Sequence, residues 1–180
     1  ETDEITTGID VSEFQGNIDW KAVADSGIDF AMIRVGYRGM KNGEIKEDAC
    51  AKYNLQEASK NGLKIGAYFF STAVTEEEAK EEAEWTKNLL SGYPVTYPVA
   101  YNCEGFQNPS SRQFELSVEE RTKLADAFLK SIEEGSYTGM FYAAKNELDD
   151  NNLWNADDLS LNYRIWVAQY SDQTWPEKTK

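Results

Sequence analysis

Two acidic residues in this sequence follow short apolar segments of the kind that form buried strands. Residues 97–106 read YPVAYNCEGF, and the apolar run before Asn102 suits a strand covered on both faces. Because side chains alternate along a strand, Asn102 and Glu104 point to one face and Cys103 to the other. A carboxylic acid and an amide then lie side by side where parallel α/β proteins place their chemistry. The alternative, a solvated turn glutamate, stays open on this segment alone.

The second acid is Asp10, which ends the short apolar segment 8–12, GIDVS. In a parallel barrel, Asp10 and Glu104 would end neighbouring strands and lie on the same rim. Two strand-end acids on one rim are the arrangement that glycoside hydrolysis uses. A glycosidic oxygen leaves well only when it is protonated, and burial or a nearby carboxylate helps an acid to hold that proton. Alternatively, Asp10 only caps a turn.

Strand-like and helix-like segments alternate around these acids. The expected strands span residues 7–12, 29–35, 64–70, 97–103, 139–144 and 164–170. The expected helices span residues 18–26, 46–61, 76–91, 117–134 and 145–154, with Asn17 or Asp19 capping the first and capping boxes at Thr75–Glu78 and Ser117–Glu120. Strands that alternate with helices imply a parallel sheet. The sequence therefore predicts an α/β fold, an irregular (β/α) barrel of TIM-like type with mostly parallel strands.

Composition narrows the classes of function. A chain of 180 residues with 41% hydrophobic residues fits one domain with a core of its own. The net charge of −14 makes nucleic acid a poor partner. Apolar runs are too short to span a bilayer, so no membrane insertion is expected. The oligomeric state stays open.

Cysteine and histidine usage limits the chemistry further. The chain has no histidine and two cysteines, Cys50 and Cys103. Metal sites built on these residue types are nearly excluded, and so are nucleophiles that depend on histidine. We expect no metal and no cofactor. Cys103 is predicted to be a small buried residue facing the helices, Cys50 to lie on a helix, and a disulfide between them is left open.

Aromatic residues cluster near the predicted strand ends. Their faces can stack on sugar rings, and a tyrosine hydroxyl can bond a sugar hydroxyl, although about half of the cluster should be ordinary core. Phe70 and Tyr142 are possible core residues, whereas Tyr37, Tyr68 and Trp166 are the better groove candidates. The full set of expected substrate-binding residues is Tyr37, Tyr68, Phe69, Tyr101, Tyr142, Trp166 and Gln169.

The pattern D-x-S-x-x-Q-G-x-I-D-W from Asp10 to Trp20 resembles the opening motif of the glycoside hydrolase family 25 lysozymes. These are N-acetylmuramidases that cut peptidoglycan. Further segments resemble the family's in the same order, and the similarity spans roughly residues 7–170. They are IRVGY at 33–37, GAYFFS at 66–71, YPV at 97–99 and WVAQY at 166–170.

The resemblance implies a peptidoglycan muramidase that hydrolyses the β-1,4 bond between N-acetylmuramic acid and N-acetylglucosamine. It makes Glu104 the general acid, with Asp10 and Asn102 as the other catalytic residues. In the family an aspartate normally stands at the position of Asn102 and works with the substrate's own 2-acetamido group. The implied partner is the peptidoglycan glycan strand, and the implied location is outside the cell, secreted or wall-associated, after removal of an export signal.

The resemblance leaves two other readings open. The departure at Asn102 favours a non-catalytic glycan-binding domain on the same scaffold, and a glycosidase for a different N-acetylated glycan also fits. The family's closing strand has no counterpart in this sequence, and Asp172 is not expected to replace its last aspartate. We therefore expect residues 1–6 to be a linker or processed N-terminus and residues 7–180 to be one catalytic barrel domain, incomplete at its C-terminal end, with 164–170 left as an edge strand.

Overall fold

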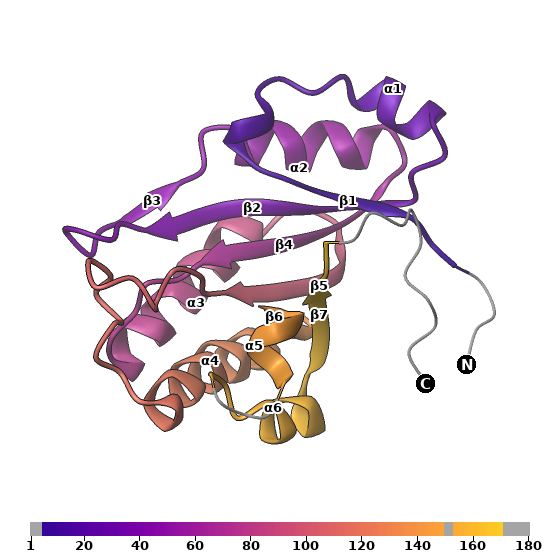
Figure 1. The fold of residues 1–180 in the computed structure, drawn as a ribbon. Coiled ribbons are helices and arrows are strands. Elements are labelled where there is room, and N and C mark those ends of the chain that lie inside the picture. Colours follow the sequence, from indigo (N-terminus) through magenta and orange to yellow (C-terminus); the bar gives the residue numbers. More distant parts are fainter. Residues whose placement is uncertain (1–4, 150–152, 171–180) are drawn as a thin grey trace.

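A curled sheet of mostly parallel strands forms the framework of the molecule (Figure 1). The computed structural model describes residues 5–149 and 153–170. Within these residues the strands run in the order β1-β2-β4-β5-β6-β7, with every neighbouring pair parallel, and β3 pairs antiparallel with β2. The strands are β1 (Gly8–Val11), β2 (Phe30–Arg38), β3 (Ile45–Glu47), β4 (Lys64–Phe70), β5 (Val95–Asn102), β6 (Gly139–Ala144) and β7 (Arg164–Ala168).

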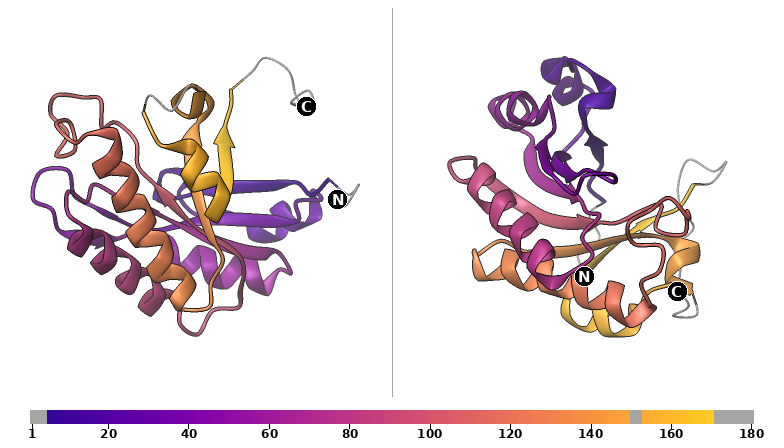
Figure 2. Two further views of the ribbon diagram at one scale, coloured as in Figure 1. Left: turned by 90° about the horizontal axis from the view of Figure 1, so that it is seen from below. Right: turned by 90° about the vertical axis from the view of Figure 1, so that its left-hand side faces the viewer.

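Helices cover the outer face of this sheet, and the inner face is concave (Figure 2). The helical elements of the described residues are η1 (Glu13–Gln15), α1 (Trp20–Asp25), α2 (Ala51–Lys60), α3 (Glu76–Leu90), α4 (Val118–Glu134), α5 (Lys145–Leu148) and α6 (Ala156–Asn162). The arrangement confirms the predicted α/β fold as an incomplete barrel of TIM-like type. Among the described residues, no strand lies against the free edge of β1 or of β7. No helix in the described ranges is long and apolar enough to cross a membrane.

Local sequence signals explain where the longer helices begin. Ser117 and Glu120 form the predicted capping box at the start of α4, each side chain accepting from the other residue's backbone N–H. At α3 the arrangement differs, although Thr75 accepts from the N–H of Glu78 as predicted. The carboxylate of Glu78 accepts instead from the N–H of Val74, at 2.9 Å. Of the two caps proposed for α1, Asp19 is the one observed.

The structure corrects two predicted helices. Residues 45–47 form β3 instead of the start of a helix, because β2 continues past its predicted end and offers backbone groups at 36–38 for pairing. Cys50 consequently stands at the N-cap position of α2, without a side-chain capping hydrogen bond, instead of lying inside the helix. The segment predicted as one helix over 145–154 gives only α5, and α6 was missed; residues 150–152 lie outside the described part.

The core lies between the sheet and its helices. Side chains that alternate outward from the strands pack on the apolar face of α4, where the ring of Phe128 lies 5.3 Å from that of Tyr101 and 6.2 Å from that of Phe69. Trp20 is also buried, and its indole N–H donates to Asn54 at 3.1 Å. Residues one position away on the same strands therefore face the concave side.

Candidate active site

A row of polar and aromatic side chains crosses four neighbouring strands near their carboxyl ends. Phe70 on β4 is in register with Asn102 on β5, Asn102 with Tyr142 on β6, and Tyr142 with Trp166 on β7. All four line one groove of about 300 Å³ on the concave side. Glu104, two residues beyond Asn102, lines the same groove, as strand alternation predicts. The strand register thus assembles the groove at a single height across the sheet.

Glu104 is held from one side by a tyrosine. The hydroxyl of Tyr142 donates to Oε1 of Glu104 at 3.1 Å. Burial raises the pKa of Tyr142, and the nearby Glu104 charge adds to this effect, so the phenol stays protonated and remains a donor. Glu104 itself is exposed, so the described residues do not supply the burial that the sequence argument considered. Tyr142, named as a possible core residue, instead touches the acid directly.

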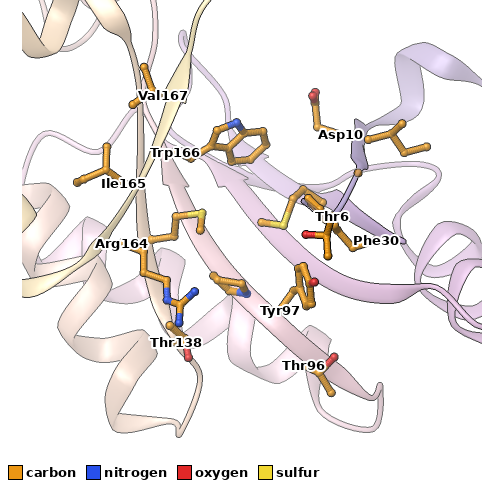
Figure 3. Close-up of a pocket in the computed structure, with 15 residues that line it drawn as sticks. Thr6, Asp10, Phe30, Thr96, Tyr97, Thr138, Arg164, Ile165, Trp166 and Val167 are labelled. Atoms are coloured by element: carbon orange, nitrogen blue, oxygen red, sulfur yellow. The ribbon is translucent and has the colours of Figure 1, made fainter. Parts of the chain in front are cut away.

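Asp10 lies on β1, at one end of the curled sheet, and lines the groove from that side. Its strand was expected beside that of Glu104, but β2 and β4 lie between β1 and β5. Curling of the sheet nevertheless brings Asp10 to the same groove as Glu104 and Trp166. Figure 3 shows Asp10 and Trp166 on opposite sides of the concave interior. The two acids therefore share a groove without being on adjacent strands.

Tryptophan and tyrosine rings form one wall of the groove. The ring of Trp166 meets that of Tyr142 edge-on at 4.9 Å and that of Tyr68 at 6.1 Å between centroids. Burial raises the pKa of Tyr68 to about 12, so its hydroxyl remains protonated across the neutral range. Such a wall presents apolar ring surface together with hydroxyl groups, which is the combination that sugar rings require.

Arg34 is a groove residue that the sequence argument did not assign. Its Nε donates to Asp48 at 2.7 Å and its Nη2 to Glu13 at 2.9 Å, and the side chain is almost completely buried. The carboxylate of Asp48 also accepts from the backbone N–H of Glu13, at 3.0 Å. The signal in the sequence is an arginine within the apolar strand 30–38, where a charge is unfavourable unless it is paired.

The turn η1 contributes three further lining residues, Ser12, Phe14 and Gln15. Ser12 and Gln15 form a capping box, which is the local reason for this turn in the opening motif. The ring of Phe14 is 79% exposed and lies 4.8 Å from the guanidinium carbon of Arg34. Tyr37 stacks on the same guanidinium at 5.2 Å.

Not every residue expected to bind substrate lies in the groove. Phe69 and Tyr101 are fully buried on the helical side of the sheet, because each is one position out of phase with the groove residues Phe70 and Asn102. The structure therefore corrects the expectation for these two residues. Tyr37 packs on Arg34 outside the lining, and the exposed Gln169 does not line it either.

A larger cavity of about 670 Å³ lies toward the amino ends of the strands (Figure 3). It joins the groove at Asp10 and Trp166, which line both. Asp10 is the one acid among its lining residues, and Phe30 and Tyr97 stack on its wall at 4.7 Å. The residues suited to acid chemistry are thus concentrated in the smaller groove.

Both cysteines are free thiols. Cys103 is buried as predicted, and its Sγ donates to Oε1 of Gln113 at 3.1 Å on the face opposite Glu104. Burial raises the pKa of the Cys103 thiol to about 12, so it is not a nucleophile at neutral pH. Among the described residues, no group of three or more Cys, Asp and Glu side chains is placed to hold a metal ion.

Comparison with known proteins gives consistent similarities. An autolytic lysozyme from Clostridium acetobutylicum is 29% identical over 164 residues, which cover 91% of this chain and 44% of that protein. The uncharacterised protein YegX from Escherichia coli is 29% identical over 175 residues, covering 91% of this chain and 56% of YegX. The chain spans about half the length of these relatives.

Solved structures share the fold. The modular autolysin LytC from Streptococcus pneumoniae, in complex with a synthetic peptidoglycan ligand, superposes with a TM-score of 0.78 at 24% identity, covering 95% of this chain and 39% of LytC. A bacterial lysozyme from Streptomyces coelicolor gives a TM-score of 0.73 at 22% identity, covering 98% of this chain and 79% of that one. The family profile of the glycosyl hydrolases family 25 matches residues 9–179. With this match over nearly the whole chain, the protein belongs to glycosyl hydrolases family 25.

Proposed function

We propose that this domain is a muramidase that hydrolyses the β-1,4 bond between N-acetylmuramic acid and N-acetylglucosamine in peptidoglycan. The observation that carries the proposal is the meeting of Glu104, Asn102 and Asp10 in one aromatic-walled groove at the carboxyl ends of the strands. Family membership and the similarity to an autolytic lysozyme support a glycoside hydrolase. A substrate of this kind places the site of action outside the cell or at its wall.

Glu104 is the general acid in this mechanism. Tyr142 donates to Oε1, which fixes the carboxyl group and leaves Oε2 to carry the proton toward the leaving glycosidic oxygen. Transfer of that proton lets the oxygen depart as a hydroxyl group. Because Glu104 is exposed in the free protein, the bound glycan has to exclude water from it.

The substrate's 2-acetamido group attacks the anomeric carbon in the same step, as in other substrate-assisted glycosidases. Water then attacks the anomeric carbon of the cyclic intermediate, which breaks the bond to the acetamido oxygen and returns a proton to Glu104. Asn102 is nearly buried, at 5% exposure, in a position to orient that group through its amide. Its carbonyl oxygen can accept from the acetamido N–H but cannot take up the proton as a carboxylate would. Asp10, across the groove, supplies negative charge near the sugar that becomes positively charged.

Digestion of purified peptidoglycan tests the bond and the mechanism together. We expect new reducing ends on N-acetylmuramic acid, identified by mass spectrometry after borohydride reduction. Material in which muramic acid has lost its acetyl group should be a poor substrate, because the internal nucleophile is missing. Reducing ends on N-acetylglucosamine would contradict the proposed bond, and equal cleavage of both materials would rule out acetamido assistance.

One observation favours a second candidate, a glycan-binding domain without catalysis. Asn102 stands where the resemblance implies an aspartate, so the groove lacks one carboxylate. Asn102→Asp separates the candidates, with turnover on peptidoglycan as the measurement. A muramidase weakened by the amide should gain activity or keep it, since the carboxylate can also accept the acetamido proton. If the natural protein is inactive and the variant gains activity while glycan affinity stays unchanged, the binding domain is the correct assignment.

A further inference from the structure

We infer that Phe14 forms a sugar-binding platform on the wall of the groove opposite Trp166, and that it holds a glycan unit beside the cleaved linkage. The inference rests on the proposed function, because it names a second sugar contact for the same groove. Phe14 comes from η1, next to β1, whereas Trp166 belongs to β7 at the other end of the strand order. Both residues line the groove.

The exposed Phe14 is held in a fixed place by its turn. Its turn is closed by hydrogen bonds between Ser12 and Gln15, in which the backbone N–H of Ser12 donates to Oε1 of Gln15 at 2.8 Å. Glu13 anchors the same turn by pairing with Arg34 at 2.9 Å and by donating its N–H to Asp48 at 3.0 Å. The phenylalanine backbone is therefore constrained on both sides, which lowers the entropy lost when a ligand binds.

The two faces of the Phe14 ring have different surroundings. Arg34 lies over one face, 4.8 Å from the ring centroid to its guanidinium carbon, and this arginine is itself fixed by Asp48 and Glu13. At 79% exposure the rest of the ring is open to solvent. A ring backed by a fixed cation and open on its other side is a rigid apolar surface at a polar groove. The C–H face of a pyranose ring is the ligand that suits such a surface.

Phe14 lies on a different wall of the groove from the residues that contact Glu104. Trp166 contacts Tyr142, which in turn bonds Glu104, so that wall holds a sugar close to the bond that breaks. Among the described residues, no ring contact joins Phe14 to that cluster, and its ring lies against Arg34 on the opposite wall. A chain of several sugars would thus contact both walls, whereas a single sugar would use one.

The test measures binding of a peptidoglycan tetrasaccharide, two repeats of the disaccharide, to a Glu104→Gln protein that cannot cut it. Adding Phe14→Ala should raise the dissociation constant about 3- to 10-fold, which is the range expected for the loss of one stacking contact. Phe14→Trp should retain binding, because it keeps an aromatic face. A set of sugar C–H resonances shifted upfield by the Phe14 ring current should appear with the parent and disappear with Phe14→Ala, while shifts caused by Trp166 remain.

Phe114→Ala is the matched control, since Phe114 is also an exposed phenylalanine, at 47%, and does not line the groove. It should bind as the parent does, and thermal unfolding should show both alanine variants folded. Equal binding with and without Phe14, or a loss with Phe14→Trp as large as with Phe14→Ala, would overturn the platform. A Glu104→Gln parent that binds no tetrasaccharide would instead overturn the proposed function itself.

Discussion

Two pairs of acidic residues in this molecule differ in their surroundings. Glu104 and Asp10 lie in the groove, exposed, and no arginine or lysine pairs with them among the described residues. Asp48 and Glu82 are fully buried, and each accepts from an arginine Nε at 2.7 Å, from Arg34 and Arg38 respectively. The same residue types therefore do different work according to whether a cation neutralises them.

The presence or absence of a paired arginine indicates which carboxyl groups can transfer a proton to a substrate. A carboxylate locked to a buried guanidinium is held in place outside the groove lining, so it cannot deliver a proton to a substrate there. Asp48 and Glu82 instead fix loops around the groove, because Arg34 anchors η1 and Arg38 donates to the backbone carbonyl of Gly43 at 2.6 Å. The groove acids, free of such partners, remain available to a ligand.

The largest expected effect on turnover comes from replacing Glu104, a groove acid that has no cationic partner among the described residues. Glu104→Gln should keep the fold, since the side chains are nearly isosteric, and should lower turnover on peptidoglycan by about 10²–10⁴-fold. Glu134→Gln, at an exposed position ending α4, is the control and should turn over normally. Unchanged turnover in Glu104→Gln would remove Glu104 from the role of general acid.

Breaking a buried pair should affect stability instead of chemistry. Arg38→Met leaves Glu82 in the interior without its cation, which should lower the free energy of unfolding by about 3–5 kcal/mol at pH 8. Arg112→Met provides a comparison, because Arg112 pairs with the partly exposed Glu78 at 2.7 Å and should cost less. Chemical denaturation measures both, and equal losses would show that burial of the pair does not matter.

A smaller effect should appear in the pH dependence of stability. Burial raises the pKa of Glu82 from 4.5 to about 7, with Ser71 and Arg38 opposing it only in part. Between these values the folded protein keeps a proton that the unfolded chain has released, so the free energy of unfolding should fall as pH rises through the window and level off above it. Glu82→Gln should flatten this part of the curve. An identical slope in both proteins would mean that another group titrates.

Much of the fold follows from the sequence, because its signals are local. The strands at 64–70 and 139–144 were predicted to the residue, and the capping box at Ser117 marks the start of α4. The strand β3 was not predicted, because its three residues owe their conformation to a partner strand that extends further than its own sequence indicates. Such pairing depends on a neighbouring strand, so the strand propensity of the three residues themselves does not predict it.

The site was predicted less completely than the fold. The alternation of side chains between the two faces of a strand explains which residues were placed correctly and which were not. It placed Asn102 and Glu104 in the groove and Cys103 behind the sheet. The same rule puts Tyr101 on the side of Cys103, where it lies, so choosing residues by aromatic type alone was misleading. Asp10 reaches the groove through curling of the whole sheet, which no segment of sequence encodes by itself.

The row from Phe70 through Asn102 and Tyr142 to Trp166 has a consequence for how this groove can change over evolutionary time. Each of its positions belongs to a different strand, and on β4, β5 and β6 the neighbouring positions build the core on the other face. Single substitutions along the row can alter the ligand contacts one at a time while the packing against α4 stays as it was. An exchange at position 102 is the type of change that this separation tolerates, whereas Tyr142 and Trp166 contact each other and offer protein engineers a coupled pair of positions.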